Sequence, residues 1–76
     1  MTKEAIVKVL KKNGYKQDGD VYYRDNYRII VYRLSTTIME QKKPKGSWQI
    51  IRSAFNDYIS LNEKGQLTFN TIPSKT

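Results

Sequence analysis

The sequence predicts a small two-layer α+β domain, in which two helices lie on one face of an antiparallel sheet in the order α-β-β-(β)-α-β-β. Apolar residues recur at helical spacing near the N-terminus and again after residue 47. β-Branched and aromatic residues dominate the stretch between, and a chain of 76 residues has room for one core. We expect residues 1–71 to form this single domain and residues 72–76 to be a frayed tail.

The first helix is expected over residues 3–13. Thr2 precedes it and can cap its first turn, and Gly14 follows it, where helices commonly end on a residue with positive φ. One side of this helix is apolar, through Ala5, Ile6, Val9 and Leu10. That side is expected to pack on the sheet.

A β-hairpin is expected after this helix. Val21–Arg24 and Tyr27–Leu34 are rich in β-branched and aromatic residues. Asp25 and Asn26 between them both tolerate the left-handed conformation that a two-residue turn requires. Residues 36–41 are expected to add a third strand.

A second helix is expected from Ser47, which follows a loop at residues 41–46 and has a side chain that can cap a helix. Its apolar stripe comprises Trp48, Ile50, Ile51, Ala54, Phe55 and Tyr58. Trp48 is therefore expected in the core. A closing hairpin is expected over Tyr58–Leu61 and Gln66–Asn70, with Gly65 in its turn.

The expected α-β-β-β-α order, with a lysine-rich entry to the second helix, resembles the plan of double-stranded RNA-binding domains. It also resembles the small HicA-type toxin fold, in which a first helix ends in a turn like Lys12 to Tyr15 and leads into the sheet. Both resemblances cover about the first three quarters of the chain, and the closing hairpin fits neither family. HicA-type nucleases depend on a histidine, and this chain has none.

Several kinds of reactive site are excluded by composition. The chain contains no histidine and no cysteine, which removes the commonest general base, the best nucleophile and the usual zinc ligands. Asp18 and Asp20 form a close acidic pair, but a calcium loop needs more ligands than these. We expect no enzymatic activity, no metal and no cofactor.

The compartment is also constrained. No window offers the roughly 18 apolar residues of a membrane span, and the N-terminal residues contain no signal-peptide core. A small secreted domain of this length is normally cross-linked by disulfides, and this chain has no cysteine. We therefore expect a cytoplasmic protein without a membrane partner.

The net charge is strongly positive, with fourteen Lys and Arg against seven Asp and Glu, or +7. A field of this sign attracts nucleic-acid phosphates and acidic protein surfaces alike. Lys42, Lys43 and Lys45 stand in the loop before Ser47, where the N-terminus of the expected second helix would also attract anions. The alternative is a solvated loop whose lysines protect an edge strand from pairing.

The first hairpin also sorts its residues between two sheet faces. With Asp25 and Asn26 as the turn, one face collects Val21, Tyr23, Arg28, Ile30, Tyr32 and Leu34. The other face collects Tyr22, Arg24, Tyr27, Ile29, Val31 and Arg33. We expect the helices to cover the first set, which leaves the tyrosines and arginines of the second set exposed. Such a face can stack bases and neutralise phosphates, or it can bury its apolar residues against another protein.

These features favour a non-enzymatic nucleic-acid-binding module, with the type of nucleic acid left open. Its expected binding residues are Lys42, Lys43, Lys45, Ser47, Tyr22, Arg24, Tyr27, Arg28 and Arg33. The alternative is a small protein-interaction module, an inhibitor or adaptor of the kind that phages and mobile elements encode, which docks on an acidic partner. A homodimer that buries the second sheet face is a third hypothesis.

Overall fold

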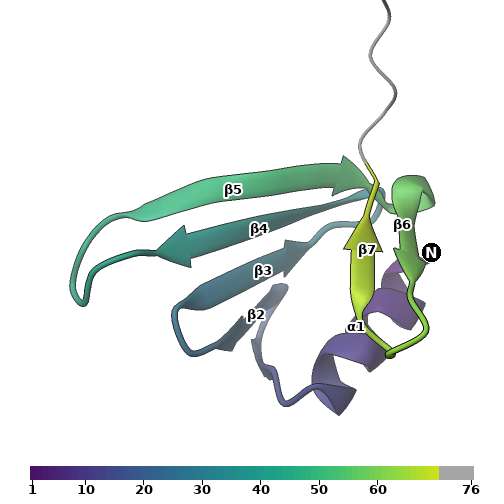
Figure 1. Cartoon of the computed structure of the whole chain (residues 1–76), viewed down its shortest axis with the longest axis horizontal. Coiled ribbons are helices and arrows are strands. Elements are labelled where there is room, and N and C mark those ends of the chain that lie inside the picture. Colours follow the sequence, from purple (N-terminus) through teal and green to yellow (C-terminus); the bar gives the residue numbers. More distant parts are fainter. Residues whose placement is uncertain (71–76) are drawn as a thin grey trace, which may run out of the picture.

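The computed structural model describes residues 1–70, so the expected tail at 72–76 lies outside the described residues. Within that range the chain forms one α-helix, a five-stranded antiparallel sheet and a two-stranded antiparallel hairpin (Figure 1). The elements are α1 (Lys3–Lys12), β1 (Lys16–Asp18), β2 (Val21–Arg24), β3 (Tyr27–Val31), β4 (Ser35–Gln41), β5 (Trp48–Phe55), the 3₁₀ turn η1 (Asn56–Tyr58), β6 (Ile59–Leu61) and β7 (Leu67–Phe69). The α+β class is confirmed, while the expected order with two helices is wrong.

Helix α1 forms where the apolar spacing predicted it. The Thr2 Oγ1 atom accepts a hydrogen bond from the Ala5 backbone N–H at 3.1 Å, which satisfies one of the unpaired donors of the first turn. The chain leaves the helix through Gly14, whose φ is +87°. Ile6 and Leu10 lie on the buried side of the helix.

The first hairpin is confirmed in position and in register. Arg24 pairs with Tyr27 and Tyr23 with Arg28, and Asp25 occupies the left-handed region with φ of 55°. The third strand is confirmed as β4, which pairs with β3. Strand β1 was not predicted, because its three residues are all polar and carry no apolar alternation.

The expected second helix is wrong, since residues 48–55 form β5 and pair along β4. Ser47 therefore precedes a strand and caps no helix. The helical spacing arose from a β-bulge. Ile38 pairs with Arg52 and Met39 with Ile50, so Ile51 is an extra residue without a partner on β4. This insertion sets apolar residues three and four positions apart, as a helix would.

With the second helix gone, the α-β-β-β-α order on which the resemblance to double-stranded RNA-binding domains and HicA-type toxins rested is not observed. The sheet is instead a continuous meander, with its strands in chain order from β1 to β5. Each neighbouring pair is antiparallel and is joined by a short connection.

The core lies between one face of the sheet and the layer made by α1 with the β6–β7 hairpin. It contains Ile6, Leu10, Tyr22, Ile29, Val31 and Ile59. The expectation that the helical layer covers the face of Val21, Tyr23, Ile30, Tyr32 and Leu34 is therefore wrong. The pairing was predicted correctly, but both faces carry apolar side chains, and only the docking of α1 decides which of them is buried.

The closing hairpin is confirmed as β6–β7, with Ile59 paired to Phe69 and Leu61 to Leu67. The chain start is tied to this region, because the Met1 amino group donates to the carbonyl oxygens of Asn56 at 2.6 Å and Ile59 at 3.1 Å. In residues 1–70, α1 is too short and too polar to cross a membrane.

Candidate nucleic-acid interface

The open face of the sheet, which points away from α1, carries aromatic and basic side chains. Both α1 and the β6–β7 hairpin contribute to the core on the opposite face, so none of the described elements covers it (Figure 1). Directly paired residues share a face, and the pairings place one continuous row across it. That row consists of Lys16, Tyr23, Arg28, Met39 and Ile50.

The open face holds a cation–π pair near the end of the sheet that bears the β4–β5 loop. The guanidinium carbon of Arg28 lies 4.2 Å from the ring centroid of Trp48. Trp48 is on β5 and Arg28 on β3, so the pair spans the intervening strand β4, and Tyr23 stands opposite Arg28 on β2. The expectation that Trp48 belongs to the core is wrong, because the bulge and the loss of the second helix place it on the open face.

A shallow depression of about 410 Å³ lies beside this pair, lined by Tyr23, Arg28 and Trp48 together with Val21. Asp18 and Asp25 also line it and oppose the positive charge of Arg28. Positive charge without such opposition lies next to Trp48, at the loop between β4 and β5.

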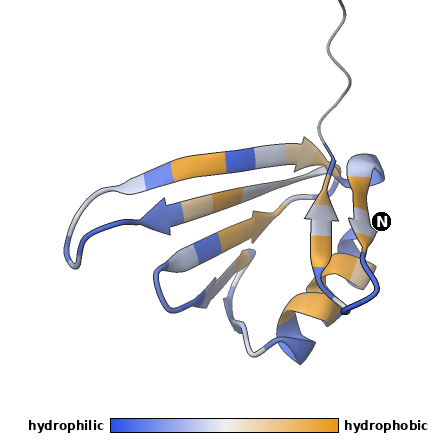
Figure 2. Ribbon diagram, in the orientation of Figure 1, coloured by the Kyte–Doolittle hydropathy of each residue, from blue (hydrophilic) through white to orange (hydrophobic). Residues whose placement is uncertain are grey.

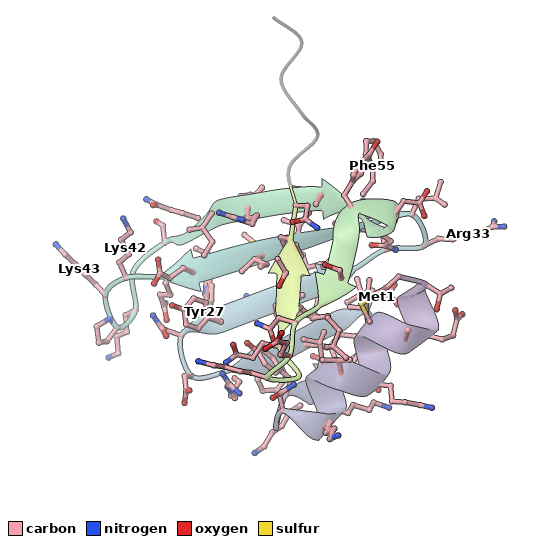
Figure 3. The ribbon with its side chains drawn as sticks, turned by 45° about the vertical axis from the view of Figure 1, so that its right-hand side comes forward. Met1, Tyr27, Arg33, Lys42, Lys43 and Phe55 are labelled. Carbon is pink, nitrogen blue, oxygen red and sulfur yellow. The ribbon has the colours of Figure 1, made fainter. Side chains whose placement is uncertain are left out.

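That loop carries Lys42, Lys43 and Lys45, and all three are exposed. It is ordered by a turn in which the Gly46 N–H donates to the Lys43 carbonyl at 2.8 Å, and Lys45 has φ of 63°. The Gln41 side chain braces it by donating to the Gly46 carbonyl at 2.8 Å. Figure 3 shows Lys42 and Lys43 projecting from the end of the sheet. The loop leads into Trp48, so the lysines and the Arg28–Trp48 pair form one connected basic-aromatic surface.

The other expected binding residues are not brought together. Tyr22 is only 2% exposed and belongs to the core. Arg24 and Tyr27 are on the same face as Tyr22, as their alternation requires. Arg33 follows β3 and lies at the opposite end of the molecule from the lysines (Figure 3). Of the arginines and tyrosines expected to bind, Arg28 alone lies on the open face, and it is on the hairpin face that the helices were expected to cover.

Arg24 and Tyr27 instead serve local structure. The Arg24 guanidinium lies 4.6 Å from the Tyr15 ring centroid and donates to the Asn13 carbonyl at 2.6 Å, which joins the end of α1 to β2. Tyr27 stands opposite Glu40 on β4. The negative charge of Glu40, together with a hydrogen bond from the phenol, raises the pKa of Tyr27 above its ordinary value of 10.0.

Sequence reasoning missed Lys16, Tyr23 and Trp48 as members of the interface. A signal for Tyr23 was present, since the predicted register already placed it opposite Arg28 on one face. No local signal could identify Trp48, because its partner Arg28 is twenty residues away and is reached only through the β4–β5 pairing.

No group of three His, Cys, Asp or Glu side chains placed to hold a metal ion occurs among residues 1–70. Comparison of the chain with protein families, with curated proteins and with solved structures finds no match.

Proposed function

We propose that this protein is a non-enzymatic module of the cytoplasm that binds single-stranded nucleic acid on the open face of its sheet. One observation carries the proposal: Arg28 stacks on Trp48 beside Tyr23, next to a loop with three exposed lysines. Aromatic rings on an open sheet stack with bases, and lysines at its edge pair with phosphates.

Single strands are favoured because a stacking platform needs bases that are free of a duplex. Tyr23 is exposed, Trp48 is partly exposed with Arg28 against one face of its ring, and α1 is on the other side of the sheet. Each base stacked on such a ring is worth about 1–3 kcal/mol.

The test is fluorescence anisotropy of labelled single-stranded DNA, single-stranded RNA and the matching duplexes across a salt series. Trp48 is the only tryptophan in the chain, so quenching of its fluorescence reports stacking at the site directly. We expect tighter binding of single strands, with quenching. Replacing Lys42, Lys43 and Lys45 by Ala should weaken binding to every sequence. It should also make the slope of log K against log salt shallower by about 2.

The matched control is the replacement of Lys8, Lys11 and Lys12 by Ala, which removes the same charge from the exposed side of α1. Because these lysines lie away from the open face, this variant should keep most of the affinity. Equal losses in the two triple variants would mean that only the net charge matters, and the proposed site would be wrong.

An acidic protein surface is the second candidate partner. A protein partner is favoured by the exposed apolar residues Tyr32, Leu34 and Phe55, which lie near the end of the sheet opposite the lysine loop. The net charge of +7 favours an acidic one. If single strands fail to quench Trp48 while an acidic protein is retained by immobilised chain, this candidate replaces the first. The homodimer expected to bury the face of Tyr22, Ile29 and Val31 is ruled out in that form, because these side chains already lie in the core. A homodimer through Tyr32, Leu34 and Phe55 instead would double the molecular mass measured by light scattering.

A further inference from the structure

A second concave site lies on the helix-bearing side of the sheet, opposite the proposed nucleic-acid interface. The end of α1, strand β7 and the inner side of the sheet enclose a hollow of about 550 Å³. This is within the usual range for small-molecule sites. In Figure 1, β7 and α1 lie next to each other at the right-hand end of the sheet.

One part of the lining of the hollow is apolar. Ile29 of β3 and Ile38 of β4 pair with each other and lie on the inner sheet face. Leu67 and Phe69 of β7 line it from the hairpin, and Leu10 lines it from α1. Such a surface favours the alkyl or aryl part of a ligand.

The polar part of the lining comprises Asn13, Gln66 and Thr68 and two arginines, Arg24 from β2 and Arg52 from β5, which carry its only charges. Each is held in place by one bond to a main-chain carbonyl: Arg24 Nη1 to Asn13 at 2.6 Å, and Arg52 Nη1 to Phe69 at 3.0 Å. A guanidinium has five N–H donors, so both retain donors for a ligand.

The charge of the hollow is unbalanced. None of the residues that line it is an Asp or a Glu. The Oδ2 atom of Asp25 lies 3.7 Å from the Arg24 Nε atom, but its side chain is exposed and the pair is solvated. Within the described hydrogen bonds and ion pairs, Arg52 has only the Phe69 carbonyl as a partner.

We infer that this hollow binds a small amphipathic organic anion. Its carboxylate or other anionic head would pair with Arg52 and Arg24, and its apolar body would lie on Ile29, Ile38 and Phe69. A charge-assisted hydrogen bond to a guanidinium supplies the orientation, and apolar contact supplies most of the buried area. This site is on the opposite sheet face from Tyr23, Arg28 and Trp48 and does not depend on the proposed function.

The experiment is a titration of the ¹⁵N-labelled full chain with octanoate, followed by NMR chemical shifts, with octanol and octyltrimethylammonium as probes of equal chain length. We expect octanoate to shift the amides of β7, of the end of α1 and of Ile38. The neutral and cationic probes should bind at least tenfold more weakly, since they lack the charge-assisted bond. Equal affinity for octanol would overturn the anionic site, and so would shifts that avoid the hollow.

The variant that tests the assignment is Arg52→Gln, which should weaken octanoate about tenfold or more. Arg33→Gln removes the same charge from the far end of the molecule and should leave octanoate affinity unchanged. If both variants lose affinity equally, the hollow is not the site. Arg52→Gln should leave Trp48 quenching by single strands unchanged, so failure of this inference and failure of the proposed function are distinguishable.

Discussion

At the scale of single residues, Asn56 holds the turn after β3 against the turn after β5. Its side chain is buried, with Oδ1 accepting from the Thr36 hydroxyl at 2.8 Å. Its Nδ2 atom donates to the carbonyl oxygens of Tyr32 at 3.2 Å and Arg33 at 3.1 Å. If this amide were removed, the Thr36 hydroxyl and the carbonyl oxygens of Tyr32 and Arg33 would lose this partner while buried or half-buried.

We therefore expect Asn56→Ala to lower the free energy of unfolding by about 2–4 kcal/mol, since it removes three hydrogen bonds and leaves the buried Thr36 hydroxyl unpaired. Urea denaturation followed by circular dichroism measures this. Asn70→Ala is the control, because its side-chain bond to Ser60 is exposed, and its effect should be within about 0.5 kcal/mol. Similar losses of unfolding free energy in the two variants would show that the buried hydrogen bonds of Asn56 stabilise the fold no more than the exposed bond of Asn70.

Tyr27 supplies a second prediction at this scale. Glu40 favours the neutral phenol, so Tyr27 in the folded chain should titrate above its ordinary pKa of 10.0. The folded chain then holds this proton more tightly than the unfolded chain. The resulting contribution to stability is complete below about pH 10 and is lost as the pH rises through the raised pKa.

Glu40→Gln removes the charge and should return the pKa of Tyr27 toward its ordinary value. The measurement is an NMR titration of ¹³C-labelled tyrosine, with Tyr27→Phe used to assign the resonance. Asp57→Asn is the control, because Asp57 is not among the groups that shift Tyr27. An unchanged Tyr27 titration in Glu40→Gln would show that Glu40 does not control it.

At the scale of elements, β5 is the least protected strand. It is eight residues long and stands at the edge of the five-stranded sheet. Ile50 is 65% exposed and Ile51 46% exposed, and Figure 2 shows the apolar segment in the middle of the strand. A long apolar edge invites pairing with another chain, and a bulge at Ile51 is a common protection against it.

Deletion of Ile51 tests this role of the bulge. Met39 already pairs with Ile50 and Ile38 with Arg52, so the deletion leaves both pairs on their present faces and makes the strand regular. We expect the deleted chain to keep its circular dichroism spectrum and to self-associate with rising concentration, as measured by light scattering. Ile51→Ser keeps the bulge and should remain at the mass of the parent chain. A deleted chain with the parent's mass would refute the protective role.

At the scale of the whole molecule, the sheet separates two different surfaces. The open face carries the Arg28–Trp48 pair and leads to the lysine loop, while the helix-bearing face encloses the hollow between Arg24 and Arg52. The two surfaces share no side chain. A variant of one surface should therefore change the affinity for its own ligand and leave the affinity for the other ligand unchanged. The +7 charge supports attraction to anions at both surfaces but selects neither.

Local pattern by itself determined much of this protein. The Thr2 cap and the apolar spacing determined α1. Asp25 and Asn26, which both tolerate the left-handed backbone conformation, determined the first hairpin and its register. The closing hairpin followed in the same way from Gly65 and its flanking strands. These elements could be predicted because their hydrogen bonds and turns involve neighbours in the sequence. The exposed lysine loop could be predicted for the same reason.

Only the tertiary structure decided what β5 is, which face of the sheet is open and where Trp48 lies. A bulged strand and a helix can share one apolar spacing, and pairing with the free edge of β4 resolves that ambiguity. Both faces of the first hairpin carry apolar residues, so the docking of α1 and the β6–β7 hairpin chooses between them. The candidate interface depends on these long-range contacts. Sequence therefore located its lysines and Arg28, while the fold supplied Tyr23 and Trp48 as their partners.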